Sequence, residues 1–231
     1  VLIVVVILLI CTREKEPSIQ GKTLFSSIPG TSSNINFVNS VSDQESFNIL
    51  TYRNFYNGGG VALGDINNDG LTDVLLISNM GNNKLYLNKG NFVFEDISIK
   101  ARIEGTRSWS TGVTMADVNA DGWLDIYVCN SGDIKGDDRE NELFINNHDL
   151  TFSEKGEEYN LNNRGLTTHA SFFDYDIDGD LDCYILNNSF ISPDKIELYK
   201  DVRTEVDSLG GDKLYRNDGN TFTDVTVDAG I

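Results

Sequence analysis

The sequence predicts an all-β fold, a β-propeller of four-stranded blades, of which about three lie within the 231 residues. Three observations predict it. An acidic nine-residue loop recurs, beginning at Asp65, Asp117 and Asp174. Short β-rich runs flank each copy and are bounded by Gly, Asn and Asp turns, whereas no long apolar stripe has helical periodicity. The copies lie roughly 55 residues apart, which suits one propeller blade each.

Each predicted blade consists of four β-rich runs, and the acidic loop separates the first run from the second. First strands are expected at 60–64, 112–116 and 169–173, and second strands at 74–77, 126–129 and 183–186. Third strands are expected at 84–88, 142–146 and 213–217, and fourth strands at 92–97, 150–154 and 221–225. The third blade also carries an insertion at about 190–211. One four-stranded sheet cannot bury both of its faces, so the blades must stack.

Loop positions 1, 3, 5 and 9 carry oxygen-bearing side chains in all three copies, and position 6 is always glycine. Alternate residues can point inward, and the glycine permits a sharp turn that lets position 7 offer its backbone carbonyl. This pattern suits Ca2+, which takes about six to eight oxygen ligands, so about three calcium sites are expected. The candidate ligands are Asp65, Asn67, Asp69, Leu71 and Asp73 in loop one, Asp117, Asn119, Asp121, Trp123 and Asp125 in loop two, and Asp174, Asp176, Asp178, Asp180 and Asp182 in loop three.

Other interpretations of these loops fit less well. An EF-hand needs a bidentate Glu at position 12, where Leu76, Val128 and Ile185 stand instead. The loops lack His and Cys, which argues against zinc and copper, and Mg2+ rarely sits in an all-protein cage. Solvated turns are the plain alternative, because Asp, Asn and Gly dominate turns, but the threefold recurrence favours a cation. Loop three has the most carboxylates and is predicted to bind calcium most tightly.

The formal net charge is −18, and filled calcium sites would neutralise only part of it. Nothing basic is available to follow a phosphate backbone, so nucleic acid is excluded as a partner. Cys129 and Cys183 stand at different offsets from their loops, which predicts buried thiols rather than a disulfide.

Residues 1–11 form an apolar decamer followed by Cys11, and no initiator Met or basic flank precedes it. Ten residues are too few to span a bilayer as a helix but suit the core of a truncated signal peptide. Cys11 stands where a bacterial lipoprotein is lipidated, although Ile10 replaces the usual small residue. Ordinary secretion and a truncated membrane anchor are the alternatives. The expected location is the bacterial cell surface or outer membrane as a lipoprotein, otherwise secreted, with contact to the membrane only through the lipid.

Residues 12–34 are expected to be a flexible tether, and 35–231 the repeat region, with units at about 52–110, 111–165 and 166–231. The last residues, 228–231, align with 100–103, which lead into the second unit. Because a propeller ring needs at least four blades, the chain is interpreted as an incomplete, N-terminal fragment of one.

The segment 52–188 resembles FG-GAP/VCBS repeat proteins, through 57–65, 109–113 and 172–176 together with the loops. It is most similar to the bacterial branch related to cartilage acidic protein. The resemblance covers about residues 35–231. It implies integrin-α-like blades with calcium in the loops, and extracellular adhesion or binding of a protein or glycan ligand. The Gly-Ala-Pro that integrins carry after the second strand is missing, so integrin-type partner recognition is not implied.

A calcium-stiffened binding module and a polysaccharide-degrading propeller, such as a lyase, are the two candidate functions. The chain has only two histidines, and no nucleophile-plus-base motif or phosphate-binding glycine loop. His169 replaces the glycine found at Gly60 and Gly112, for which packing or hydrogen bonding is favoured over catalysis. His148 is expected in an exposed turn. The sequence therefore predicts a non-enzymatic binding module with structural calcium.

Overall fold

The structure is a computed structural model that describes residues 24–231 except 53, 108, 133–138, 189–208 and 220. The apolar decamer, Cys11 and most of the third-blade insertion therefore lie outside the described residues. Among the described residues, no helix has the length and apolar character needed to cross a membrane.

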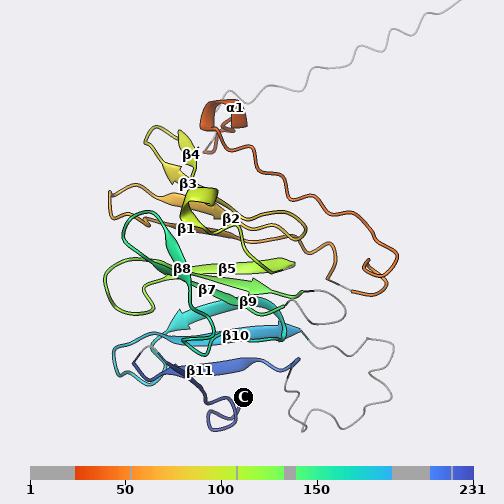
Figure 1. Ribbon diagram of the computed structural model, residues 1–231, viewed down its shortest axis with the longest axis vertical. Helices are drawn as coiled ribbons and strands as arrows, with labels where there is room; N and C mark the ends of the chain where they lie inside the picture. Colours follow the sequence, from red (N-terminus) through yellow and green to blue (C-terminus); the bar gives the residue numbers. More distant parts are fainter. Residues whose placement is uncertain (1–23, 53, 108, 133–138, 189–208, 220) are drawn as a thin grey trace, which may run out of the picture.

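Three four-stranded antiparallel sheets are stacked one upon another (Figure 1). Each takes its strands in chain order, so each is a simple meander. The first sheet contains β1 (Val61–Gly64), β2 (Asp73–Leu76), β3 (Lys84–Asn88) and β4 (Phe94–Asp96). The second contains β5 (Ser110–Ala116), β6 (Asp125–Asn130), β7 (Glu142–Asn146) and β8 (Phe152–Glu154). The third contains β9 (Leu166–Phe173), β10 (Asp182–Asn188), β11 (Lys213–Asn217) and β12 (Phe222–Asp224). This confirms the predicted all-β blades, and the described residues form no closed ring.

The predicted strand positions hold, with shifts at the ends. The third strands match the prediction in all three blades. The second strands begin at the closing Asp of each loop, because that residue already pairs with the first strand, as Asp73 does with Gly64. In blades two and three the first strand begins earlier than predicted, at Ser110 and Leu166. The described residues contain two helices of a single turn, α1 (Gly30–Ser33) and α2 (Ser98–Ala101), so α1 lies within the segment expected as a tether.

The apolar core lies between the blades. Leu75 and Leu85 of the first blade pack in one cluster with Val128 and Phe144 of the second. The opposite face of the second blade, with Tyr127, Cys129 and Leu143, shares a cluster with Ala170, Cys183 and Ile185 of the third. All six residues of β6 are buried, because both faces of the middle blade are covered. Apolar burial of this kind, at about 25 cal/mol per Å2, is the main force that holds neighbouring blades together.

Among the described residues, nothing covers one face of the first blade in this way. Val61 and Leu63 of β1 are 59% and 64% exposed. Their counterparts in the second blade, Val113 and Met115, pack in the core between blades one and two. The same alternation of side chains thus produces a core where another blade is stacked on it and an apolar surface where none is.

The first strands of blades two and three, β5 and β9, approach closely at Gly112. A Cβ atom at Gly112 would lie only 2.4 Å from the carbonyl oxygen of Thr168 and 3.0 Å from Cα of His169. His169 occupies the equivalent position of blade three, where its side chain is exposed. Glycine is therefore required at residue 112, where β9 passes, whereas no strand of the described residues passes over His169.

Cys129 and Cys183 are buried and free, as predicted. Burial raises the pKa of the Cys129 thiol and of the Cys183 thiol, so both remain protonated and unreactive at neutral pH.

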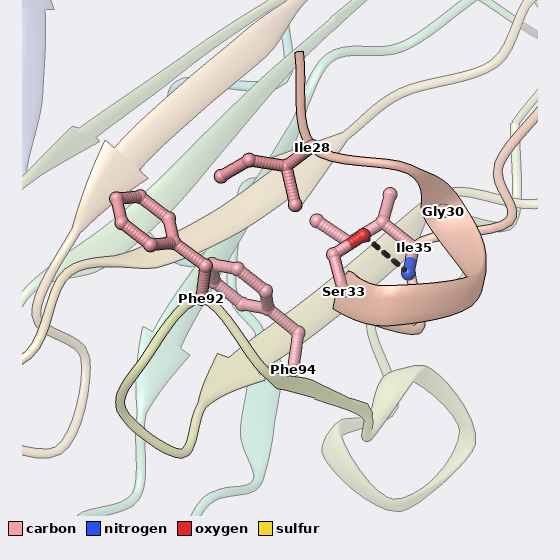
Figure 2. A pocket seen from close by; sticks show the side chains of 6 residues that line it. All are labelled: Ile28, Gly30, Ser33, Ile35, Phe92 and Phe94. Carbon is pink, nitrogen blue, oxygen red and sulfur yellow. Dashed lines mark hydrogen bonds between the residues drawn. The ribbon is translucent and has the colours of Figure 1, made fainter. Parts of the chain in front are cut away.

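Two features of the N-terminal segment were not predicted. Phe47 and Phe55 pack around Trp109, with ring centroids 4.7 and 4.8 Å from it, and join the segment to the start of β5. Beside α1, a shallow pocket of about 280 Å3 lies between the chain at Ile28 and Ile35 and the aromatic rings of Phe92 and Phe94 (Figure 2). None of the six residues that line this pocket is charged, so it does not have the composition of a cation site.

Candidate metal centre

All three acidic loops connect the first strand of a blade to the second, and loops one and two are in contact. Asn68 Nδ2 in loop one donates a hydrogen bond to the Gly122 carbonyl in loop two, at 3.0 Å. Stacking of the blades therefore brings the predicted ligands of loops one and two to one edge of the stack.

The position-1 carboxylates fold each loop back on itself. Asp65, Asp117 and Asp174 each accept hydrogen bonds from the backbone N–H groups of positions 5 and 6, at 2.7 to 3.1 Å. Short acidic side chains commonly satisfy nearby backbone donors in this way. Hydrogen bonds within the loop thus determine its geometry, and they hold each position-1 carboxylate at the loop centre.

The position-9 carboxylates have a different and buried role. Asp73, Asp125 and Asp182 are 0% exposed. Each accepts one hydrogen bond from the N–H of loop position 2 and one from the N–H of the last residue of the third strand, at 2.7 to 3.0 Å. Burial raises the pKa of Asp125 to about 6 in spite of these two hydrogen bonds. The closing Asp is therefore a structural anchor of the blade as well as a candidate ligand.

The glycine at position 6 is required by the backbone. Gly70, Gly122 and Gly179 have φ values of 84°, 87° and 100°, which residues with a Cβ rarely adopt. Position 4 is also left-handed, and there the sequence offers no glycine. Ile177 has φ 66° and is 88% exposed, so a β-branched side chain is strained there without any gain from burial.

Replacement of Ile177 by Asn should therefore stabilise the protein. Asn tolerates the left-handed region, and relief of the strain should raise the free energy of unfolding by about 1 kcal/mol. Urea unfolding in the presence of EDTA measures this. Leu50→Asn is the matched control, because Leu50 is 93% exposed and its φ is not positive. An equal gain in both variants would show that exposure, not strain, is the cause.

Loop three fits a hard cation best. Carboxylate oxygens of Asp174, Asp176 and Asp182 lie within 4.8 Å of one another. Asp180 Oδ1, at position 7, is buried without a hydrogen-bond partner, a costly state that a cation would relieve. Burial, followed by the neighbouring charge of Asp178, raises the pKa of both Asp176 and Asp180. Crowded carboxylates of this kind attract a divalent ion.

Loops one and two are arranged differently at positions 3 and 5. Asn67 Nδ2 donates to Asp69 Oδ2 at 3.0 Å, and Asn119 Nδ2 donates to Asp121 Oδ2 at 2.9 Å. Asn67 Oδ1 is left buried and unpartnered, so loop one also has an oxygen available to a cation. In the residues that the structure describes, neither loop brings three carboxylates as close together as loop three does.

His148 lies in the predicted turn but is a neighbour of loop two. Its Nε2 is 3.0 Å from Asp121 Oδ2, and its ring stacks on Trp123 with centroids 4.7 Å apart. Burial tends to raise the pKa of Asp121, but the hydrogen bonds from His148 and from the Trp123 N–H outweigh it, so the pKa is lowered. No sequence pattern places a residue 27 positions away beside a loop, so this contact was missed.

The sequence interpretation also missed the asparagine that ends each third strand. Asn88, Asn146 and Asn217 supply the backbone N–H that binds the closing Asp, and each side-chain amide donates to the carbonyl of loop position 8. The signal was present in the sequence, because an Asn recurs at the same strand position in all three blades.

Comparison with known proteins supports the loops as repeats of a known kind. Residues 65–128 match the family described as FG-GAP-like repeat. The chain is 28% identical to cartilage acidic protein 1 of Xenopus tropicalis over 153 residues, 66% of this chain and 23% of that protein. It is 26% identical to the Homo sapiens cartilage acidic protein 1 over 65% of this chain and 22% of that protein. It is 32% identical to integrin alpha-8 of Gallus gallus over 40% of this chain and 10% of that protein.

These matches confirm the predicted resemblance to FG-GAP repeat proteins. The chain spans less than a quarter of the length of the cartilage acidic proteins that it matches.

Proposed function

We propose that this chain is a calcium-binding propeller module of an exported protein, and that it binds an extracellular protein or glycan ligand. The proposal rests on the recurrence of a loop whose candidate ligands are all oxygen atoms. In the third copy of this loop, oxygens of three carboxylates lie within 4.8 Å of one another. Similarity to an integrin alpha subunit supports the extracellular binding role. Catalysis is not part of the proposal, because the candidate site residues all belong to structural loops.

The side chains at positions 1, 3, 5 and 9 and the carbonyl at position 7 would hold the ion. Calcium would supply positive charge that offsets the repulsion among the carboxylates. The shape of each site comes from the protein's own hydrogen bonds. The position-1 Asp stabilises the turn, and the closing Asp connects the turn to the third strand. The stacked blades keep neighbouring loops at one edge. The metal is thus structural, and ligand binding belongs to other loops. We also propose that a lipid attached to Cys11 anchors the module to a cell surface.

Calcium should stabilise the protein, and loop three should bind it most tightly. A ligand at about 100 times its dissociation constant adds about 2.7 kcal/mol to the free energy of unfolding. Isothermal titration calorimetry of Asp65→Ala, Asp117→Ala and Asp174→Ala measures each loop, because each variant lacks one position-1 carboxylate. The Asp174→Ala variant should lose the tightest site. Equal losses in the three variants would contradict the ranking, and an unchanged melting temperature in EDTA would contradict calcium binding.

The binding role is tested on a glycan array and an extracellular-matrix protein array, each with calcium and with EDTA. Binding that requires calcium, without release of shorter products, is the expected result. Cleavage of a polysaccharide would instead identify an enzyme.

A further inference from the structure

Asn217 connects two neighbouring acidic loops. Its backbone N–H donates to Asp182 Oδ1 in loop three at 2.9 Å, and its side-chain Nδ2 donates to the Leu181 carbonyl of the same loop at 3.3 Å. The same Nδ2 lies 3.3 Å from the carbonyl of Val118, the second residue of loop two. One buried side chain therefore contacts two acidic loops in different blades.

Asn146 repeats this arrangement one blade earlier. Its N–H donates to Asp125 Oδ1 in loop two at 2.9 Å, and its Nδ2 donates to the Leu124 carbonyl at 3.1 Å. The same Nδ2 donates to the carbonyl of Ile66, the second residue of loop one, at 2.9 Å. The repetition of the inter-blade bond at the same position makes an accidental contact an inadequate explanation.

These hydrogen bonds form one continuous series that crosses all three stacked blades. The peptide groups of Ile66 and Val118 are the links, because each N–H donates to the closing Asp of its own loop while the carbonyl of the same residue accepts from the next blade. The series of hydrogen bonds thus runs from Asp73 through Asn146 to Asp125, and from Asp125 through Asn217 to Asp182. Hydrogen-bonded chains of buried groups can carry coupling between sites.

We propose that Asn146 and Asn217 couple calcium binding between adjacent loops, so that an ion in one loop raises the affinity of its neighbour. The inference rests on the calcium binding proposed above. An ion in loop three would fix Asp182, and with it Asn217 and the Val118 carbonyl. Val118 lies between the loop-two candidates Asp117 and Asn119, so part of the ordering that loop two needs would already be complete.

Loops one and two have a second direct link, the hydrogen bond from Asn68 to Gly122. Loop two has Ala120 at the position of Asn68, and alanine has no side-chain donor. The pair of loops two and three is therefore the cleaner place to test the role of the Asn.

Trp123 permits a measurement that is specific to loop two, since it stands at position 7 of that loop. Terbium replaces calcium at oxygen sites, and light absorbed by tryptophan but not by tyrosine excites terbium bound nearby. Trp109, the other tryptophan, belongs to the aromatic cluster with Phe47 and Phe55. Calcium titration of the terbium signal then gives the loop-two affinity, with loop three intact or disabled by Asp178→Ala.

With the native Asn217, Asp178→Ala should weaken calcium binding at loop two by about fivefold or more, a typical size for coupled sites. In the Asn217→Ala variant, affinity at loop two should already be reduced, and Asp178→Ala should change it less than about twofold. Asn88→Ala is the matched control, because Asn88 Nδ2 donates to the Thr72 carbonyl of its own blade and, among the described residues, the Asn88 side chain makes no hydrogen bond to another blade. Asp178→Ala should retain its full effect there.

Two results would overturn the inference: an Asp178→Ala effect of equal size with and without Asn217, or no effect in the wild-type chain. Circular dichroism checks that each variant is folded. If Asn217→Ala does not fold, the same cycle with Asn146→Ala and Asp69→Ala, in an Asn68→Ala background, decides the question. Absence of terbium and calcium binding in every variant would instead refute the proposed function itself.

Discussion

The Asp125→Ala variant should be less stable than the wild-type protein by about 2–4 kcal/mol, even with EDTA present. Asp125 is fully buried and accepts hydrogen bonds from the N–H groups of Val118 and Asn146, both of which are buried. Its removal leaves two buried donors without partners, at about 1–3 kcal/mol each. Part of this loss is offset, because burial makes the charge costly and raises the pKa of Asp125 to about 6. Urea unfolding at neutral pH measures the difference.

Asp117→Ala is the matched control, because it removes another carboxylate from the same loop. The Asp117 carboxylate accepts hydrogen bonds from exposed backbone N–H groups, not from buried ones. In EDTA it should cost about 1 kcal/mol or less. With calcium, both variants should lose the stabilisation that loop two contributes. If the two variants were equally stable in EDTA, the closing Asp would be only a ligand and the anchoring role would be refuted.

The Gly112→Ala variant should lose about 3 kcal/mol of stability, although it adds one methyl group. The new Cβ would lie 2.4 Å from the Thr168 carbonyl oxygen and 3.0 Å from the His169 Cα. Both are backbone atoms of β9, so this strand of blade three must move away from blade two. The apolar cluster between these blades would open, which thermal unfolding followed by circular dichroism detects as a lower melting temperature.

Gly64→Ala separates this clash from the general effects of replacing glycine in a strand. A Cβ at Gly64 would lie 2.6 Å from Leu124 Cδ1 and 2.8 Å from Met115 Sδ, which are the far ends of flexible side chains. These atoms can move at little cost, so the change in stability should stay within about 1 kcal/mol. Equal losses in the two variants would contradict the view that backbone contact sets the distance between blades.

The recurring loop made most of the architecture predictable. Its three copies fixed the number of blades. The third strands were located to the residue because the five-residue segment Lys84–Asn88 recurs at 142–146 and 213–217, each time as a charged residue, Leu, an aromatic residue, one further residue and Asn. The early starts of β5 and β9 were not predictable. Ser110 and Leu166 extend these strands because they pair with Asn130 and Asn188, beyond a register shift that no local pattern encodes.

The sequence predicted which residues belong to the candidate site, but not the different structural roles of loop positions 1 and 9. The motif gave equal rank to positions 1 and 9, whereas only position 9 is buried and tied to another strand. That difference arises from the packing of the third strand over the loop, which is a tertiary contact. The strain at Ile177 and the contact of His148 with Asp121 likewise depend on the folded backbone.

Each sheet is formed from one uninterrupted stretch of chain, and this has a consequence for biosynthesis. The hydrogen bonds within a sheet join strands that are neighbours in sequence, so the loops to be closed are short and pairing is fast. As the polypeptide leaves the ribosome, the strands of the first blade can pair before the second blade has been synthesised, although its core is completed only when the second blade packs on it. Each new blade then packs on the exposed apolar face of the blade before it, so folding can proceed blade by blade, as in a repeat array, without waiting for the C-terminal residues.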